Sequence, residues 1–211
     1  MARKKIDMGK GAVKVLVLRG SPRKKGNSGH LADAAAAGAR EAGAEVEDVL
    51  LHALDIGPCA ACGHCHRAKH AGRCRIDDDM QGLYPKLRAA DALILASPIY
   101  WFTVSAQTKL LMDRCYALMG DKDPEGRSPL AGKRVGILLT YAEPDPLFSG
   151  VANAVRTFQD MFGYIGAPIV DIVHAAAEEA GDIATNPEAL RRARELGRAL
   201  AKSPVPPPAA A

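Results

Sequence analysis

The chain has 211 residues, of which 48% are hydrophobic and 25% charged, and it carries a formal net charge of +4 at pH 7. This size and composition predict one globular domain that buries a core without disulfide or metal staples. The sparse aromatic residues argue against a nucleic-acid partner, and the absence of any apolar run near the roughly 20 residues of a membrane span argues against a membrane.

Strand and helix patterns alternate along the chain without internal repeats. Residues 1–12 are expected to form a flexible basic leader and residues 203–211 a Pro/Ala-rich tail, leaving 13–202 as the domain. Strands are predicted at 13–18, 45–51, 91–97, 133–141 and 168–174. Helices are predicted at 28–42, from Pro85, at 104–119, at 151–165, and from Pro187 with Asn186 as N-cap.

This alternation predicts the fold class α/β: a doubly wound, five-stranded parallel sheet with helices on both faces. In such sheets a ligand binds outside the carboxyl ends of the strands, near the point where the strand order reverses. The loops after the first, third and fourth strands are therefore the candidate site. They comprise residues 20–28, 97–103 and 140–146.

The first loop has the composition of a phosphate cradle. It fits neither the dinucleotide pattern GxGxxG nor the Walker pattern, because Pro22 and Lys25 replace the required glycines and Asn27 stands where a lysine is needed. Ser21, Asn27 and Ser28 nevertheless supply donors beside the first turn of a helix, where free N–H groups attract an anion. The alternative is that Asn27 or Ser28 merely caps the helix.

The second loop places three consecutive aromatic residues, 100–102, directly after the buried strand. Their flat faces suit a planar heteroaromatic ring, although core packing or a subunit interface is the alternative. A phosphate cradle and an aromatic wall on one sheet edge describe a ligand with a phosphate at one end and a flat ring at the other. Flavin mononucleotide (FMN) fits that description.

A long loop, residues 55–79, contains four of the five cysteines in the spacing C-x2-C-x2-C-x8-C: Cys59, Cys62, Cys65 and Cys74. Three closely spaced thiols with a fourth farther on favour a 4Fe-4S cluster over zinc, and reduced thiols without metal are the alternative. The basic N-terminus has no apolar core behind it, so we expect no secretory signal and a cytoplasmic location, where a disulfide scaffold is disfavoured. Histidines 64, 66 and 70 are expected to be solvated, and Cys115 to be a small buried hydrophobe.

Several motifs in order resemble the NADPH-dependent FMN reductase family of flavodoxin-like proteins, over about 13–201, and the cysteine loop resembles the iron-sulfur flavoproteins. The motifs are Gly-Ser-Pro-Arg at 20–23, Gly-Asn-Ser at 26–28, Asp-Asp-Met at 78–80, Ser-Pro-Ile-Tyr-Trp at 97–101, Val-Ser-Ala-Gln at 104–107, and then Lys109, Asp113 and Arg114.

The resemblance implies two sets of flavin contacts. The phosphate would be held by Ser21, Arg23, Asn27 and Ser28, and the isoalloxazine would be bordered by Pro98, Ile99, Tyr100 and Trp101, with Tyr141 and Ala142 carried over from the third loop. The resemblance also implies homodimers or homotetramers with the flavin near a subunit interface.

The expected function is a cytoplasmic oxidoreductase in which NAD(P)H reduces FMN, and FMN passes electrons to a quinone, another flavin, a metal species or the cluster. Because this chemistry belongs to the cofactor, we assign no catalytic side chain. One alternative is an electron carrier that holds flavin and cluster but binds no nicotinamide. Another is a cofactor-free binding protein that has kept the fold.

Overall fold

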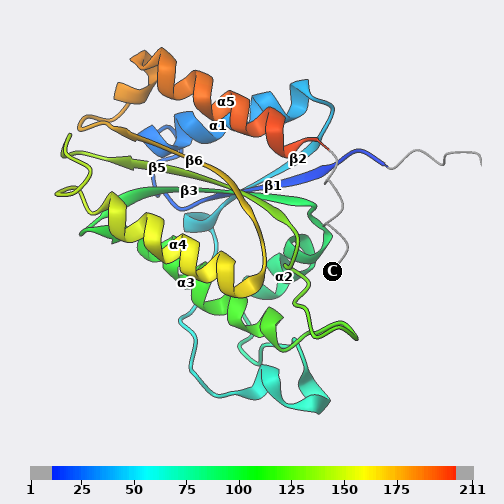
Figure 1. Ribbon diagram of the computed structural model, residues 1–211. Helices are drawn as coiled ribbons and strands as arrows, with labels where there is room; N and C mark the ends of the chain where they lie inside the picture. Colours follow the sequence, from blue (N-terminus) through cyan, green and yellow to red (C-terminus); the bar gives the residue numbers. More distant parts are fainter. Residues whose placement is uncertain (1–10, 203–211) are drawn as a thin grey trace, which may run out of the picture.

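Five parallel strands form the centre of the protein (Figure 1). The computed structural model describes residues 11–202, so the first ten residues of the predicted leader and the whole predicted tail lie outside the described residues. The sheet order is β2-β1-β3-β5-β6, which confirms the predicted parallel, doubly wound arrangement. The strands are β1 (Lys14–Arg19), β2 (Glu45–Leu50), β3 (Ala92–Tyr100), β5 (Arg134–Tyr141) and β6 (Ile169–Ala176).

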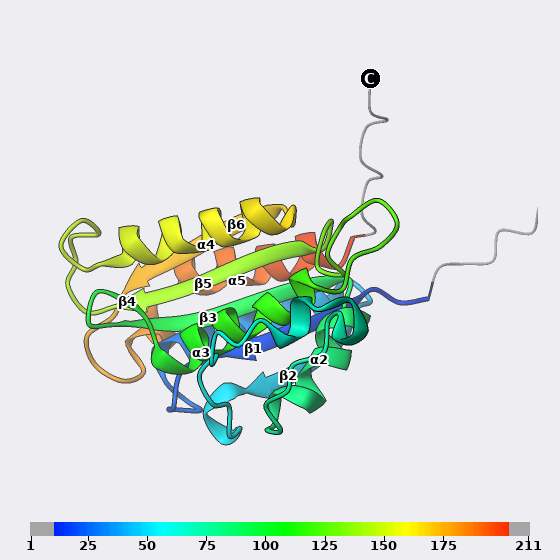
Figure 2. The same cartoon turned by 90° about the horizontal axis from the view of Figure 1, so that it is seen from below.

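Helices cover both faces of this sheet, as Figures 1 and 2 show. Alternate residues of each strand point to opposite faces, so Val15 and Val17 belong to one core cluster while Leu16 and Leu18 belong to the other. The first cluster packs beneath α1 (Asn27–Glu41) and α5 (Pro187–Leu200). The second packs beneath α2 (Met80–Ala89), α3 (Ala106–Arg114) and α4 (Val151–Ile165). Short 3-10 turns complete the described chain: η1 (Leu51–Ala53), η2 (His64–His66), η3 (Ala68–His70), η4 (Cys115–Met119) and η5 (Asp182–Thr185).

Glycines let α1 and α5 approach each other at backbone distance. A Cβ atom on Gly38 would lie 2.0 Å from the carbonyl oxygen of Arg194, and one on Gly197 would lie 1.9 Å from that of Ala35. The α5 helix begins as predicted, because the Asn186 side chain accepts a hydrogen bond from Ala189 N at 3.0 Å.

The third strand and the segment after it differ from the prediction. The strand continues to Tyr100, and the two-residue strand β4 (Thr103–Val104) pairs antiparallel with its end, which adds a sixth strand. Trp101 and Phe102 form the intervening turn with φ angles of 49° and 66°. Proline is tolerated in the extension because β1 ends opposite Ala96, which leaves Pro98 with a parallel neighbour on one side.

The helix predicted to begin at Pro85 begins instead at Met80. An Asp78 carboxylate oxygen accepts a hydrogen bond from Met80 N at 3.1 Å and so satisfies one of the free donors at the helix start. Met80, Leu83 and Leu87 form the buried face of this helix, while Pro85 is exposed. The burial of that face outweighs the hydrogen bond lost at the proline. None of the helices within residues 11–202 is both long and apolar enough to cross a membrane.

Candidate functional site

The three loops identified from the sequence meet at one edge of the sheet and enclose a cleft of about 130 Å³. The strands end at this edge, on the left of Figure 1. Every side chain predicted for the flavin site lines the cleft except that of Trp101. The full lining is Ser21, Arg23, Gly26, Asn27, Ser28, Pro98, Ile99, Tyr100, Thr140, Tyr141, Ala142, Ala177, Glu178 and Ala180.

The first turn of α1 presents free backbone donors to this cleft. Gly26 is the N-cap residue, and no side chain caps the helix, so neither Asn27 nor Ser28 plays the capping role that was the alternative. Within the described residues, the N–H groups of Asn27 and Ser28 have no acceptor. The exposed guanidinium of Arg23 adds positive charge beside them. This arrangement suits a dianion such as a phosphomonoester.

The side chain of Asn27 is fully used by the segment after β6. Its Nδ2 donates to the carbonyl oxygens of Ala177 at 3.4 Å and Glu179 at 2.8 Å. Its Oδ1 accepts from Gly181 N at 2.9 Å and Ile183 N at 3.3 Å. The amide therefore fastens this segment to the phosphate loop, and Asn27 can offer an anion its backbone N–H rather than its side chain.

Buried hydroxyl groups connect the phosphate loop to the β3–β4 hairpin. Ser105 Oγ donates to the carbonyl oxygen of Gly20 at 2.8 Å, and Ser105 N donates to Ser97 Oγ at 3.0 Å. Gly20 N donates to the carbonyl oxygen of Ala96 at 2.8 Å. A Cβ atom on Gly20 would lie 1.9 Å from Thr108 Oγ1, so the close approach of α3 requires glycine here.

The two residues at the hairpin tip, Trp101 and Phe102, do not line the cleft. Trp101 is 92% exposed, and Phe102 beside it is also exposed. The α4 helix supports the tip from behind, because Asn153 Nδ2 donates to the carbonyl oxygen of Phe102 at 3.1 Å. Leu147 and Phe148 are exposed on the loop that leads into α4. We call these four exposed residues, on the hairpin tip and on the loop before α4, the aromatic rim.

Tyr141 lines the cleft and is held in place by His174. Its hydroxyl group hydrogen-bonds His174 Nδ1 at 2.9 Å, and its ring packs at a tilt against the imidazole. Burial raises the pKa of Tyr141. Burial, followed by the nearby charge of Arg192, lowers the pKa of His174. A neutral pair of this kind fixes the wall of the site without adding charge to it.

Sequence reasoning missed the part of the cleft that follows β6, namely Ala177, Glu178 and Ala180. The rule that directed attention to the other loops applies equally here, because β6 ends at the same edge as β5. The fifth loop was therefore predictable from its position, although its residues carry no recognisable motif.

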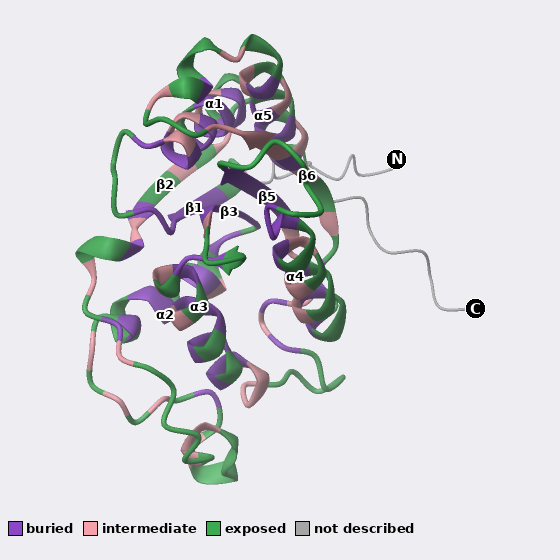
Figure 3. Cartoon of the chain, turned by 90° about the vertical axis from the view of Figure 1, so that its left-hand side faces the viewer, coloured by how far each residue is buried: buried purple, intermediate pink, exposed green. Residues whose placement is uncertain are grey.

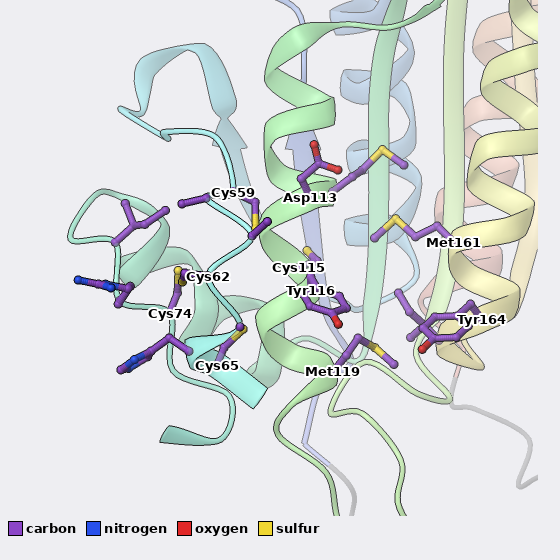
Figure 4. Close-up of a pocket in the computed structure, with 18 residues that line it drawn as sticks. Cys59, Cys62, Cys65, Cys74, Asp113, Cys115, Tyr116, Met119, Met161 and Tyr164 are labelled. Carbon is purple, nitrogen blue, oxygen red and sulfur yellow. The ribbon is translucent and has the colours of Figure 1, made fainter. Parts of the chain in front are cut away.

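The four clustered cysteines line a second, larger cavity of about 620 Å³ beneath α3 (Figure 4). The loop that carries them hangs below the helices and is largely exposed in Figure 3. The opposite wall comes from α3, η4 and α4 and is mostly apolar, with Asp113 of α3 as a charged member. It includes Met112, Cys115, Tyr116, Met119, Met161, Tyr164 and Ile165.

The chain segment between Cys65 and Cys74 folds back on itself. Gly72 N donates to the carbonyl oxygen of Cys65 at 3.0 Å, which returns the chain to the third cysteine before it reaches the fourth. A Cβ atom on Gly120 would lie 2.0 Å from that same oxygen, so η4 packs directly against the turn. All four cysteines are free thiols, and burial raises the pKa of Cys65.

The histidines of the loop are engaged in stacking. The His64 ring lies 4.0 Å from that of His70, and the His66 ring lies 4.2 Å from that of Tyr116. Among residues 11–202, no three His, Cys, Asp or Glu side chains are grouped tightly enough to hold a single metal ion. Cys115 is buried as predicted, and its burial raises its pKa to about 12.

Arg114, at the end of α3, joins both ends of the cysteine loop. Its Nη1 donates to the carbonyl oxygen of Gly57 at 2.8 Å, and its Nη1 and Nη2 donate to the two carboxylate oxygens of Asp78 at 2.5 and 2.9 Å. Burial opposes ionisation of Asp78, but the hydrogen bonds from Arg114 and Gly57 N outweigh it and lower the pKa of this carboxyl group. The Arg114 Nη2 also lies 3.5 Å from Cys74 Sγ.

Comparison with known proteins gives a family match over most of the chain. A family model described as NADPH-dependent FMN reductase matches residues 13–182. An iron-sulfur flavoprotein of Archaeoglobus fulgidus is 33% identical over 195 residues, which cover 90% of this chain and 80% of that protein. An iron-sulfur flavoprotein of Methanosarcina thermophila is 41% identical over 106 residues, and this match spans about half of each chain, 50% and 54% respectively.

Solved structures show the same fold. The NAD(P)H:quinone oxidoreductase from Methanothermobacter marburgensis has a TM-score of 0.68 and 20% sequence identity, covering 90% of this chain and 100% of that one. At this identity the likeness concerns the fold alone.

Proposed function

Because the chain belongs to the NADPH-dependent FMN reductase family, we propose that it oxidises NAD(P)H on FMN bound in the cleft and transfers the electrons to a separate acceptor. We further propose that the four cysteines hold a 4Fe-4S cluster that takes part in this transfer. The observation that carries the proposal is the presence of two separate sites in one domain, an anion cleft at the sheet edge and a four-thiol cavity beneath α3.

The residues of the cleft fit the phosphate end of FMN. The unpaired N–H groups of Asn27 and Ser28 and the charge of Arg23 face a space of about 130 Å³. That volume suits the phosphate and the start of the ribityl chain, which leaves the tricyclic ring to be bound at the rim near Tyr100. Bound FMN would supply hydride acceptance and electron transfer, while the protein supplies position and charge.

The cysteine cavity fits a cluster better than a single ion. Cys59, Cys62, Cys65 and Cys74 all border one space, yet they do not converge as ligands of one ion would. A cubane takes its four thiolate ligands at separate corners, and three closely spaced cysteines with a fourth farther on are typical of its ligands in sequence. A cluster would supply one-electron transfer. Because its ligands are reduced thiols, we propose the reducing cytoplasm as the location of the protein.

The aromatic rim supports a proposal of self-association. Large contiguous apolar patches on a protein surface usually mark interaction sites. Trp101 and Phe102 on the hairpin and Leu147 and Phe148 on the loop before α4 are exposed, and Gly150 at the end of that loop lies against the Phe102 backbone. We propose that a second copy of the chain covers the aromatic rim in a homodimer or homotetramer, so that the flavin lies near a subunit interface.

The flavin part of the proposal is tested by steady-state kinetics. Protein purified without oxygen and loaded with FMN should oxidise NADH or NADPH when a quinone or free flavin is added as acceptor. Tight FMN binding without turnover of either nicotinamide would instead identify an electron carrier, and a protein that ignores added FMN would contradict the whole assignment.

The cluster part is tested by iron and acid-labile sulfide analysis of the same preparation. Cys62→Ala should remove iron and sulfide while leaving bound flavin, because Cys62 lines the cysteine cavity and not the cleft. Cys115→Ala is the matched control. The Cys115 thiol borders the same cavity from η4 but is not one of the proposed ligands. Wild-type protein without iron or sulfide would show that the cysteines serve as bare thiols.

A further inference from the structure

Arg114 is buried next to the four-cysteine cavity and does more than form an ion pair. Its side chain is 1% exposed, and that of Asp78 is 7% exposed. Because Gly57 precedes the first cysteine and Asp78 follows the last, the guanidinium fixes the entry and the exit of the cysteine loop against α3. The loop has little regular structure of its own, so these contacts hold its two ends at a set separation.

The orientation of the guanidinium follows from which of its atoms are occupied. Asp78 takes one hydrogen from each terminal nitrogen, Nη1 and Nη2. The remaining Nη2 hydrogen lies on the same edge of the planar group as the Nε hydrogen, and this edge faces Cys74 Sγ at 3.5 Å. Within the described residues, Nε is the buried side-chain polar atom that lacks a partner. One edge of Arg114 is therefore satisfied by a carboxylate, while the other presents donors toward the fourth cysteine.

We propose that Arg114 is the positioning residue of the cysteine site, an inference that rests on the proposed cluster. Its free edge holds Cys74 Sγ in place as the fourth ligand, and its positive charge offsets the negative charge of four thiolates. The unpartnered Nε hydrogen gains an acceptor when sulfur ligands gather in the cavity. Groups that orient metal ligands in this way typically change metal affinity by about 10–100-fold when they are altered.

The structure offers a closely matched control in Arg88. Like Arg114, it pairs with a carboxylate, its Nε donating to Asp121 at 2.9 Å, and it also donates from Nη2 to a carbonyl oxygen of the cysteine loop, that of Gly72, at 3.1 Å. Unlike Arg114, it donates to no cysteine sulfur. Comparing Arg114→Lys with Arg88→Lys therefore separates the sulfur contact from general anchoring of the loop.

The experiment measures iron and sulfide per chain, the rate of iron loss to a chelator, and the reduction potential of the cluster, all without oxygen. Arg114→Lys should lose iron about 10–100-fold faster than wild type, whereas Arg88→Lys should resemble wild type. In case Arg114→Lys folds poorly, the double variant Arg114→Met/Asp78→Asn removes the charge without leaving a buried partner ionised. It should lower the reduction potential, because the guanidinium contacts Cys74 Sγ directly whereas Asp78 lies on another edge of it, so the loss of the nearer cation outweighs the loss of the carboxylate. Bound FMN and the unfolding temperature report whether each variant is folded.

Wild-type iron retention and potential in both Arg114 variants would overturn the inference, as would equal iron loss from Arg88→Lys. Wild-type protein that binds FMN but contains no iron would refute the cluster itself, and the inference with it. That result is visible before any variant is compared, so the two failures are distinguishable.

Discussion

Asn27 is expected to control stability and flavin affinity together, through a segment distant in sequence. Replacing Asn27 with alanine removes four hydrogen bonds, two of them short, to Glu179 O at 2.8 Å and from Gly181 N at 2.9 Å. The other two, at 3.4 and 3.3 Å, are long and contribute less. At about 1 kcal/mol for each short bond, the free energy of unfolding should fall by about 2 kcal/mol. For a chain of this size that corresponds to a drop of about 4–8 °C in unfolding temperature.

The same substitution should weaken FMN binding, because the released segment carries Ala177, Glu178 and Ala180 of the cleft lining. Ser28→Ala provides the contrast. Its hydroxyl group lines the cleft and makes no hydrogen bond within the described residues, so its loss should weaken FMN binding by about 1–3 kcal/mol with little effect on stability.

Urea unfolding of the apoprotein and fluorescence titration with FMN measure these two effects. Asn186→Ala is the control, since Asn186 caps α5 and lines no part of the cleft. It should cost about 1 kcal/mol of stability and leave FMN affinity unchanged. The reasoning is refuted if Asn27→Ala unfolds like wild type. It is also refuted if Asn186→Ala loses as much FMN affinity as Asn27→Ala does.

Three further outcomes are expected. Burial lowers the pKa of His174 in the folded state below its unfolded value of 6.5, so the unfolded chain binds the proton first and wild type should lose stability as the pH falls from 6.5 through the folded-state pKa. His174→Gln should flatten this dependence in urea unfolding at pH 5 to 7. Gly197→Ala should destabilise the fold by about 1–3 kcal/mol because its Cβ would meet Ala35 O at 1.9 Å. Gly163→Ala, whose Cβ would enter open space, should stabilise the fold by about 0.5–1 kcal/mol. Calorimetry that ranks the two variants the other way contradicts the packing described. Trp101→Ser should shift sedimentation toward the monomer, and an unchanged distribution would remove the aromatic rim as the subunit contact.

The parallel, doubly wound sheet and the meeting of three loops could be predicted from sequence because both follow from the alternation of strand and helix patterns. Apolar runs identify buried strands, and parallel connectivity places their carboxyl ends on one edge. The boundaries of β3 and α2 were predicted wrongly: the strand was ended at residue 97, just before Pro98, and the helix was started at Pro85 because proline is tolerated in a first turn. Pro98 sits beyond the end of β1, and Pro85 sits on an exposed helix face, so both positions tolerate it.

The roles of Asn27 and Arg114 could not be predicted from sequence spacing. Asn27 has the residue type of a helix cap or an anion ligand, yet its partners lie some 150 residues away in the segment after β6. Arg114 belongs to a recognisable motif, but its contact with Cys74 depends on how the cysteine loop folds under α3. Long-range partners of this kind are chosen by tertiary packing, which leaves no periodic trace in the sequence.

The hydrogen bond from Gly72 N to Cys65 O closes residues 65–72, between the third and fourth cysteines, into a loop whose two ends lie together. Residues such as Arg67 and Lys69 extend outward from it and are exposed. Shortening or lengthening this loop between its hydrogen-bonded ends would leave Cys74 where it is. The number of residues between these cysteines therefore measures the size of a peripheral lobe, and a chain with an unusual count can still present its thiols in the same arrangement.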